Sequence, residues 1–172
     1  FLSPHLVGTP PPVTFEPRTF DAEWITNARF AADGKTVVFS AALTGNTPDL
    51  FVTRPGSKVA QRVGPPHTQL LSVSSKDELA VLIDVHFIQQ RLFAGTLARM
   101  TLDGAPRKWL EDVREADWSP DGSKLAIVHA VGSTDQLEYP AGTALHRASG
   151  YVSEVRVAPD GVHVAFFEHP FR

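Results

Sequence analysis

One strand–turn–strand phrase occurs three times in the sequence. RFAADGKTVVFS occupies residues 29–40, DWSPDGSKLAIV residues 117–128 and RVAPDGVHVAFF residues 156–167. Asp-Gly between apolar stretches is among the strongest short-range signals for a β-hairpin. Gly supplies positive φ, Asp tolerates left-handed or bridge backbone, and Pro presets φ at the first corner. We therefore predict tight turns at Asp33, Gly34, Pro120, Asp121, Gly122, Pro159, Asp160 and Gly161.

The spacing of the three copies indicates a fourth, weaker one. LSVSSKDELAVLI at 71–83 keeps the strand–turn–strand shape, with Lys76 and Asp77 where Asp-Gly would stand. With that copy included, the phrase recurs at a period of roughly 40–45 residues, which is typical of four-stranded propeller blades. A single four-stranded sheet cannot bury both faces alone, so neighbouring blades must stack to build the core. The repetition therefore predicts the architecture of the chain, which is a series of stacked propeller blades.

The expected fold class is all-β: a partial β-propeller of four-stranded blades, with about three and a half blades present. Fourteen prolines and twelve glycines interrupt short β-rich runs, and no long stretch shows a helical apolar period. We expect a linker and an outer strand at 1–26, the strand itself falling at 13–20 and completing a closing blade. Blade one is expected at 27–69, blade two at 70–113, blade three at 114–151 and a truncated half of blade four at 152–172.

The quoted phrases also carry a family resemblance. FAADGKTVVFSA, WSPDGSKLAIV and VAPDGVHVAFF resemble the TolB-type propeller repeat, and PRTFDAEWITNARF is similar to the phrase before its first blade. The resemblance covers about residues 14–169. It departs at Ala32, which replaces Pro, and in the second copy, which lacks Pro-Asp-Gly. Such propellers occur in periplasmic TolB, in the gating domain of prolyl-oligopeptidase-like peptidases and in extracytoplasmic sensor regions of bacterial membrane-bound serine/threonine kinases.

Within that group, the sequence looks most like the kinase-attached propellers. EDVREADWSPDGSKLAIV and LEYPAGTALHRASGYVSEVRVAPDG carry this resemblance, and SPHLVGTPPPVTFEP would suit a linker that follows a transmembrane helix. The resemblance implies a bacterial, extracytoplasmic (periplasmic) sensor domain, with a cytoplasmic location left open. We expect a non-catalytic recognition or sensing module that binds a protein or a small ligand. The alternative is the substrate-gating propeller of a prolyl-oligopeptidase-like serine peptidase.

Motifs for catalysis, cofactors or metals are missing from the sequence. No Gly-x-Ser-x-Gly, Walker loop or Gly-x-Gly-x-x-Gly occurs, and the serine of GYVSEV, Ser153, lies in an expected strand. The chain has no cysteine, its histidines lack the spacing of metal ligands, and its Asp-Gly turns lack the dense acidic alternation of calcium loops. We therefore expect no enzyme activity, cofactor or metal in this chain alone.

The charge of the chain and the pattern of its apolar residues limit the kinds of partner that it is expected to bind. The net charge of -3 lacks the excess of basic residues that nucleic-acid binding needs, so we expect no nucleic-acid partner. No apolar run is long enough to span a membrane, so we expect no membrane contact by this segment. An incomplete ring would expose open sheet faces, so we expect self-association through the open propeller ends. Trp24, Trp109 and Trp118 are predicted to pack between blades, and RPGSKVAQR at 54–62 is predicted to be a solvated edge strand.

Overall fold

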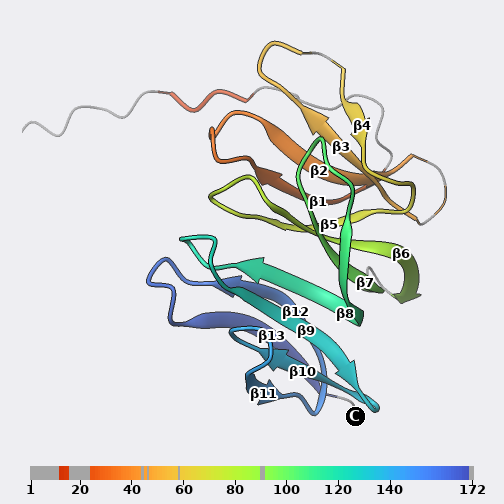
Figure 1. Cartoon of the computed structure of the whole chain (residues 1–172), viewed down its shortest axis with the longest axis vertical. Coiled ribbons are helices and arrows are strands. Elements are labelled where there is room, and N and C mark those ends of the chain that lie inside the picture. Colours follow the sequence, from red (N-terminus) through yellow and green to blue (C-terminus); the bar gives the residue numbers. More distant parts are fainter. Residues whose placement is uncertain are drawn as a thin grey trace, which may run out of the picture.

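The computed structural model describes residues 12–15, 24–43, 45, 47–57, 59–89 and 92–170. These residues form thirteen antiparallel-paired β-strands and no helix. In Figure 1 the strands β1–β4 lie in the upper part of the molecule and β9–β13 in the lower part. The predicted fold class, a partial β-propeller, is confirmed. Within the described residues no helix has the length and apolar character needed to cross a membrane.

Blade one is a four-stranded meander in which each strand pairs with the next. The Asp-Gly turn joins its first two strands, whose register runs from Phe30 opposite Val37 to Trp24 opposite Ala42. Residues 12–15 are not in a strand, and the rest of the outer strand expected at 13–20 lies outside the described residues. The four strands of the blade are β1 (Trp24–Phe30), β2 (Val37–Ala42), β3 (Asp49–Thr53) and β4 (Gln61–Val63).

Blades two and three share one long strand, β8 (Arg107–Trp118). Its first half is the outer strand of blade two and its second half is the inner strand of blade three. The change occurs at Val113, which pairs with Gly95 of β7 on one side and with His129 of β9 on the other. The two blades therefore form one seven-stranded sheet, completed by β5 (Gln69–Val73), β6 (Leu79–Gln89), β7 (Leu92–Met100), β9 (Leu125–Val131), β10 (Thr134–Glu138) and β11 (Ala144–Arg147).

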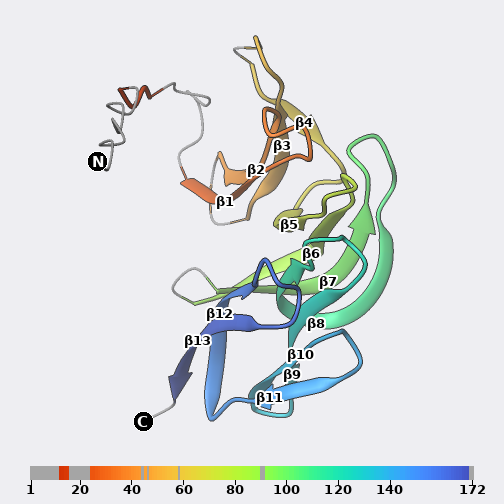
Figure 2. The same cartoon turned by 90° about the vertical axis from the view of Figure 1, so that its left-hand side faces the viewer.

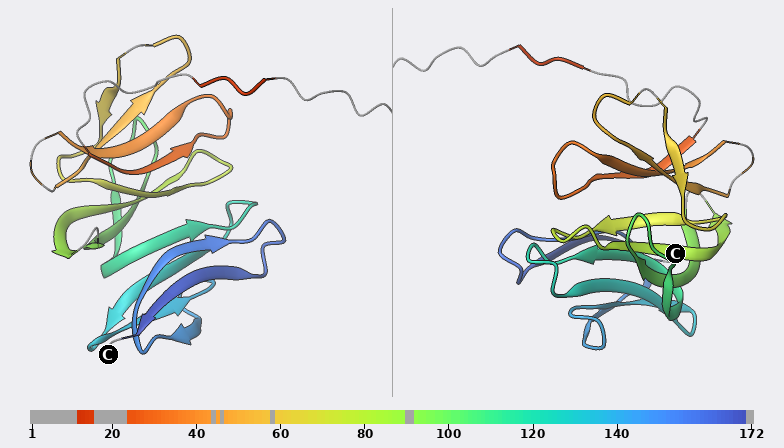
Figure 3. Two further views of the ribbon diagram at one scale, coloured as in Figure 1. Left: turned by 180° about the vertical axis from the view of Figure 1, so that it is seen from behind. Right: turned by 45° about the horizontal axis from the view of Figure 1, so that its top comes forward.

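Blade four consists of the hairpin β12 (Gly150–Val157) and β13 (Val164–Pro170). Figure 2 shows the blades fanned in an arc, with β1 at one end and β12–β13 at the other. Figure 3 shows the same order from behind and from above. The inner strands of the four blades are β1, β5, the second half of β8 and β12.

The core lies between blades because successive side chains of a strand point to opposite faces of its sheet. Leu79, Val81 and Ile83 of β6 pack against blade one, whereas Ala80 and Leu82 pack against blade three. The β9 strand alternates in the same way: its odd-numbered residues face blade two and its even-numbered residues face blade four. Because both faces are buried, the sequences of β6 and β9 contain continuous runs of apolar residues.

The three tryptophans have different environments. Trp118 is buried in the core between blades two and three, and Trp24 packs against the same core with its ring centroid 5.8 Å from that of Phe93. Trp109 is 49% exposed, so its predicted packing between blades is wrong. The cause is a register shift: Lys108 and Leu110 pair with the adjacent residues Ala98 and Leu97, which leaves Trp109 as a bulge.

Candidate functional site

The turns between the first and second strands of the four blades lie on one face of the molecule, at the left in Figure 1. We call this surface the turn face; it consists of residues 31–36, 74–78, 119–124 and 158–163. In blades one, three and four the glycine amide closes the turn and has positive φ. These glycines are Gly34 (φ 64), Gly122 (φ 63) and Gly161 (φ 68), which donate to Ala31, Ser119 and Ala158 over 2.9, 2.8 and 2.9 Å.

The aspartates of these turns bind their own backbone. Asp121 Oδ1 accepts hydrogen bonds from the Ser119 hydroxyl at 2.6 Å and from the Ser123 amide at 3.0 Å. Asp33 and Asp160 likewise accept the amides two and three residues further on. The Ser119 and Ser123 hydrogen bonds hold the pKa of Asp121 well below its usual value. Carboxylates satisfied in this way fix the shape of the turn.

The aspartates of the other two Asp-Gly turns on the turn face, Asp33 and Asp160, also have lowered pKa values because of hydrogen bonds. The backbone amides of Lys35 and Thr36 lower the pKa of Asp33. The hydrogen bond from the His163 side chain is the main cause that lowers the pKa of Asp160, and the hydrogen bond from the His163 amide lowers it further. Both carboxylates are therefore charged at neutral pH.

Blade two closes its turn without glycine. Asp77 has φ 57 and donates its amide to the Ser74 carbonyl at 3.1 Å, so it takes the place that glycine has in the other blades. Asp77 Oδ1 accepts the amide of Ala32 at 2.7 Å and so joins the turns of blades one and two. This link between blades could not be read from the sequence phrase.

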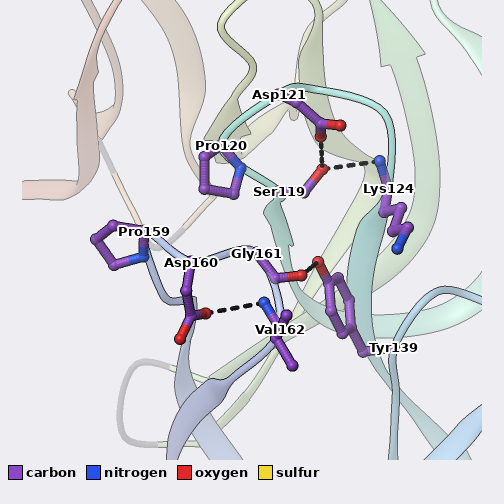
Figure 4. A pocket seen from close by; sticks show the side chains of 9 residues that line it. All are labelled: Ser119, Pro120, Asp121, Lys124, Tyr139, Pro159, Asp160, Gly161 and Val162. Carbon is purple, nitrogen blue, oxygen red and sulfur yellow. Dashed lines mark hydrogen bonds between the residues drawn. The ribbon is translucent and has the colours of Figure 1, made fainter.

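A cavity of about 370 Å³ lies between the turns of blades three and four (Figure 4). Lys124 and Tyr139 lie on one side of it in this view, and Pro120, Pro159 and Asp160 on the other. The Tyr139 hydroxyl donates to the Gly161 carbonyl at 2.7 Å, which connects blade three to the turn of blade four. The full lining is Ser119, Pro120, Asp121, Lys124, Tyr139, Pro159, Asp160, Gly161 and Val162.

A matching cavity of about 300 Å³ lies between blades one and two. Its walls come from the turn of blade one, the turn of blade two and the outer hairpins of both blades. The turn face therefore carries the same kind of hollow at two of its blade junctions. This second lining is Ala31, Asp33, Thr36, Arg54, Lys76, Asp77, Thr101, Leu102 and Asp103.

The inner strands carry a second group of polar residues. Asp117 in blade three accepts the Ser72 hydroxyl of blade two at 2.6 Å and the Val157 amide of blade four at 2.9 Å. The pKa of Glu115 is raised to about 7, mainly by burial and to a smaller extent by the nearby Glu154 carboxylate. Charged residues on the inner strands that the sequence did not single out are Arg29, Glu115, Glu154 and Arg156.

Blade four contains a serine–histidine contact. The Ser153 hydroxyl lies 2.9 Å from His169 Nε2, and the His169 ring stacks on Tyr151 with centroids 4.3 Å apart. No carboxylate in the described part of the chain contacts His169. Three other described histidines each pair with one carboxylate: His129 with Glu138 at 2.9 Å, His146 with Glu168 at 3.0 Å and His163 with Asp160 at 2.6 Å. No group of three possible metal ligands occurs within the described residues.

The blades, three of which have four strands and two of which share β8, carry their first turns on one face, and this arrangement defines a partial β-propeller of TolB type. No protein-family model matches the chain, and no curated protein matches its sequence. Among solved structures, the fold is similar to that of TolB from Acinetobacter baumannii, with a TM-score of 0.62 and 14% sequence identity. The match covers 85% of this chain and 38% of that one, so this chain spans well under half of the TolB structure.

Proposed function

We propose that this chain is a non-catalytic recognition module that binds a partner protein or a small ligand on its turn face. The cavity between the turns of blades three and four carries this proposal. Its walls include two prolines and two turns whose backbones are fixed by Asp121 and Asp160. A surface held in one shape loses little conformational entropy on binding, which favours recognition.

The chemistry of this cavity supports binding rather than catalysis. Asp121 and Asp160 accept hydrogen bonds from their own turns, which stabilise the charged form and oppose a role in proton transfer at neutral pH. Tyr139 is engaged with the Gly161 carbonyl. The cavity thus offers an aromatic ring, apolar proline surfaces and the Lys124 ammonium group as contacts for a partner.

We further propose an extracytoplasmic setting, as the sensor region of a bacterial receptor kinase. The support is the resemblance of the third and fourth repeats to kinase-attached propellers, together with the TolB-type fold. The full-length coding sequence is the direct test. A kinase domain and a membrane helix before this segment would support the proposal, whereas an α/β-hydrolase with Gly-x-Ser-x-Gly after it would favour substrate gating.

A site-specific crosslinking experiment tests binding on the turn face. A photoreactive amino acid would replace Val162, an exposed residue in the cavity lining, in the full-length protein inside its host cell. The matched control would replace Leu145, which is also exposed but lies on the outer strand β11. We expect one defined adduct at position 162 and none at position 145. Equal adducts at both positions, or none at either, would contradict the proposal.

A further inference from the structure

The four Asp-Gly steps of the chain occupy the same place in a four-residue turn. In each turn the glycine amide donates to the main-chain carbonyl three residues before it, over 2.8 to 3.1 Å. All four aspartates are exposed, so exposure does not distinguish them. Three of the steps belong to the turn face, and the fourth joins β7 to β8. The steps are Asp33-Gly34, Asp103-Gly104, Asp121-Gly122 and Asp160-Gly161.

Asp103 differs from the other three aspartates in what its carboxylate contacts. The carboxylates of the turn face accept main-chain amides that lie two or three residues further on. Asp103 accepts no hydrogen bond and forms no ion pair with any described residue. One cause is Pro106, which has no N–H and lies at the position from which Thr36 and His163 donate to their aspartates. Gly104 also lacks the positive φ of the other three glycines, so the chain leaves this turn along a different path.

An Asp-Gly step can rearrange without an enzyme or a co-reactant. The glycine main-chain nitrogen attacks the carboxyl carbon of the aspartate side chain; a C–N bond forms, and the amide hydrogen and the carboxyl hydroxyl group leave as water. Water then reopens this five-membered succinimide ring at its main-chain carbonyl, which links the chain through the side-chain carboxyl group and gives isoaspartate. Glycine permits the close approach because it has no Cβ atom. The reaction needs a protonated carboxyl group, whose hydroxyl can leave, and a side chain that is free to turn onto the glycine nitrogen.

The three aspartates of the turn face fail both requirements. Hydrogen bonds to a carboxylate favour its charged form, and they lower the pKa of Asp33, Asp121 and Asp160. The same hydrogen bonds hold each carboxylate on groups other than the glycine nitrogen, as Asp160 Oδ1 accepts the Val162 amide at 2.9 Å. A carboxylate must break these bonds before it can react, and this opposes the reaction. Within the described residues, neither restraint acts on Asp103.

We propose that Asp103-Gly104 is a modification site at which this chain forms isoaspartate, whereas the three Asp-Gly steps of the turn face resist the reaction. The product has one more methylene group in its main chain. Its free α-carboxyl group is the group that isoaspartyl methyltransferases esterify with S-adenosylmethionine. Asp103 lines the cavity between blades one and two, so the conversion would change the wall of that cavity. The inference does not depend on the proposed function, because the reaction requires only the local turn.

One experiment compares all four steps in the same chain. The folded chain would be kept at neutral pH and physiological temperature, and samples taken over time would be digested with trypsin. Isoaspartyl methyltransferase with radiolabelled S-adenosylmethionine would then measure the isoaspartate in each separated peptide. We expect at least about tenfold more isoaspartate at Asp103 than at any other step, because hydrogen bonds restrain the other three carboxylates. Trypsin places each step on its own peptide: 30–35, 100–107, 115–124 and 157–172.

Two controls separate the effect of the fold from that of the local sequence. In guanidinium chloride the four steps should convert at similar rates, because each aspartate precedes a glycine and the contacts of the folded chain are absent. Asp103→Glu should remove most methyl acceptance from the folded chain, because glutamate would have to close a larger ring. The proposal is overturned if the folded chain forms isoaspartate equally at the four steps, at none of them, or faster at a step of the turn face. It is also overturned if Asp103 leads by the same factor in guanidinium chloride, since the folded contacts would then play no part.

Discussion

Asp117 Oδ2 accepts the backbone amide of Val157 at 2.9 Å, and through this contact an inner strand of blade three holds the inner strand of blade four. The other oxygen of the same carboxylate accepts the Ser72 hydroxyl of blade two. One side chain thus spans three blades. Its hydrogen bonds replace main-chain pairing, which is absent between the inner strands of neighbouring blades in the described residues.

We expect Asp117→Ala to lower the free energy of unfolding by about 1–3 kcal/mol, because the Val157 amide and the Ser72 hydroxyl lose their charged acceptor. Urea denaturation followed by circular dichroism would measure the change. Asp103→Ala is the control, since Asp103 lies exposed in the turn between β7 and β8. Equal midpoints for the two variants would show that the Asp117 contacts contribute nothing to stability.

Gly122→Val should destabilise the chain by about 1 kcal/mol or more, because valine disfavours positive φ. A Cβ atom at this position would also lie 3.2 Å from the Ser74 Cβ atom of blade two. Gly34→Val is a matched control, since Gly34 has nearly the same φ but a Cβ atom there would meet nothing within 4 Å. We expect the larger loss at Gly122, and thermal denaturation would measure the difference. An unchanged midpoint for Gly122→Val would contradict the turn geometry.

Stability should depend on pH through Glu115, whose pKa rises from 4.5 to about 7 on folding. The folded chain holds this proton more tightly than the unfolded chain. The contribution of Glu115 is therefore most favourable below about pH 4.5 and is lost as the pH rises toward about 7. The loss should be on the order of 1–3 kcal/mol.

Glu115→Gln isolates this contribution, because glutamine does not titrate. The free energy of unfolding would be measured for both proteins at about pH 5 and about pH 8. We expect the natural chain to lose more stability over this interval than the variant does. Asp33, Asp121 and Asp160 have lowered pKa values, so their contributions are lost only at lower pH. Parallel pH profiles for the two proteins would contradict the prediction.

We also propose that this chain self-associates through the surfaces at the two ends of its arc. Phe30 of blade one and Phe167 of blade four are each 65% exposed, and β13 pairs only with β12 among the described strands. Burying these side chains between copies would be favourable. Light scattering at micromolar concentration should give a dimer or larger species, and Phe167→Glu should reduce its size. A monodisperse monomer of the natural chain would refute self-association.

Local signals in the sequence predicted the fold because the repeat is a hairpin phrase whose turn chemistry needs no distant contact. Gly122 and Asp121 could be assigned to a turn from their neighbours alone. The contacts between blades could not, because they join residues far apart in the sequence, such as Asp77 with Ala32 and Tyr139 with Gly161. The exposure of Trp109 was missed for a similar reason, since a bulge depends on the register with β7.

The strand β8 continues from blade two into blade three, although its register shifts between Val113 and Glu115, and this continuity has a consequence for cooperativity. Separation of blade two from blade three would require bending or melting β8 around Val113, whereas blades one and four have no strand shared with their neighbours in the described residues. Blades two and three should therefore open together as one folding unit, and the hydrogen-bonded amide protons of β6, β7 and β9 should exchange with solvent mainly through global unfolding. The end blades can open separately, as terminal repeats do in a one-dimensional array.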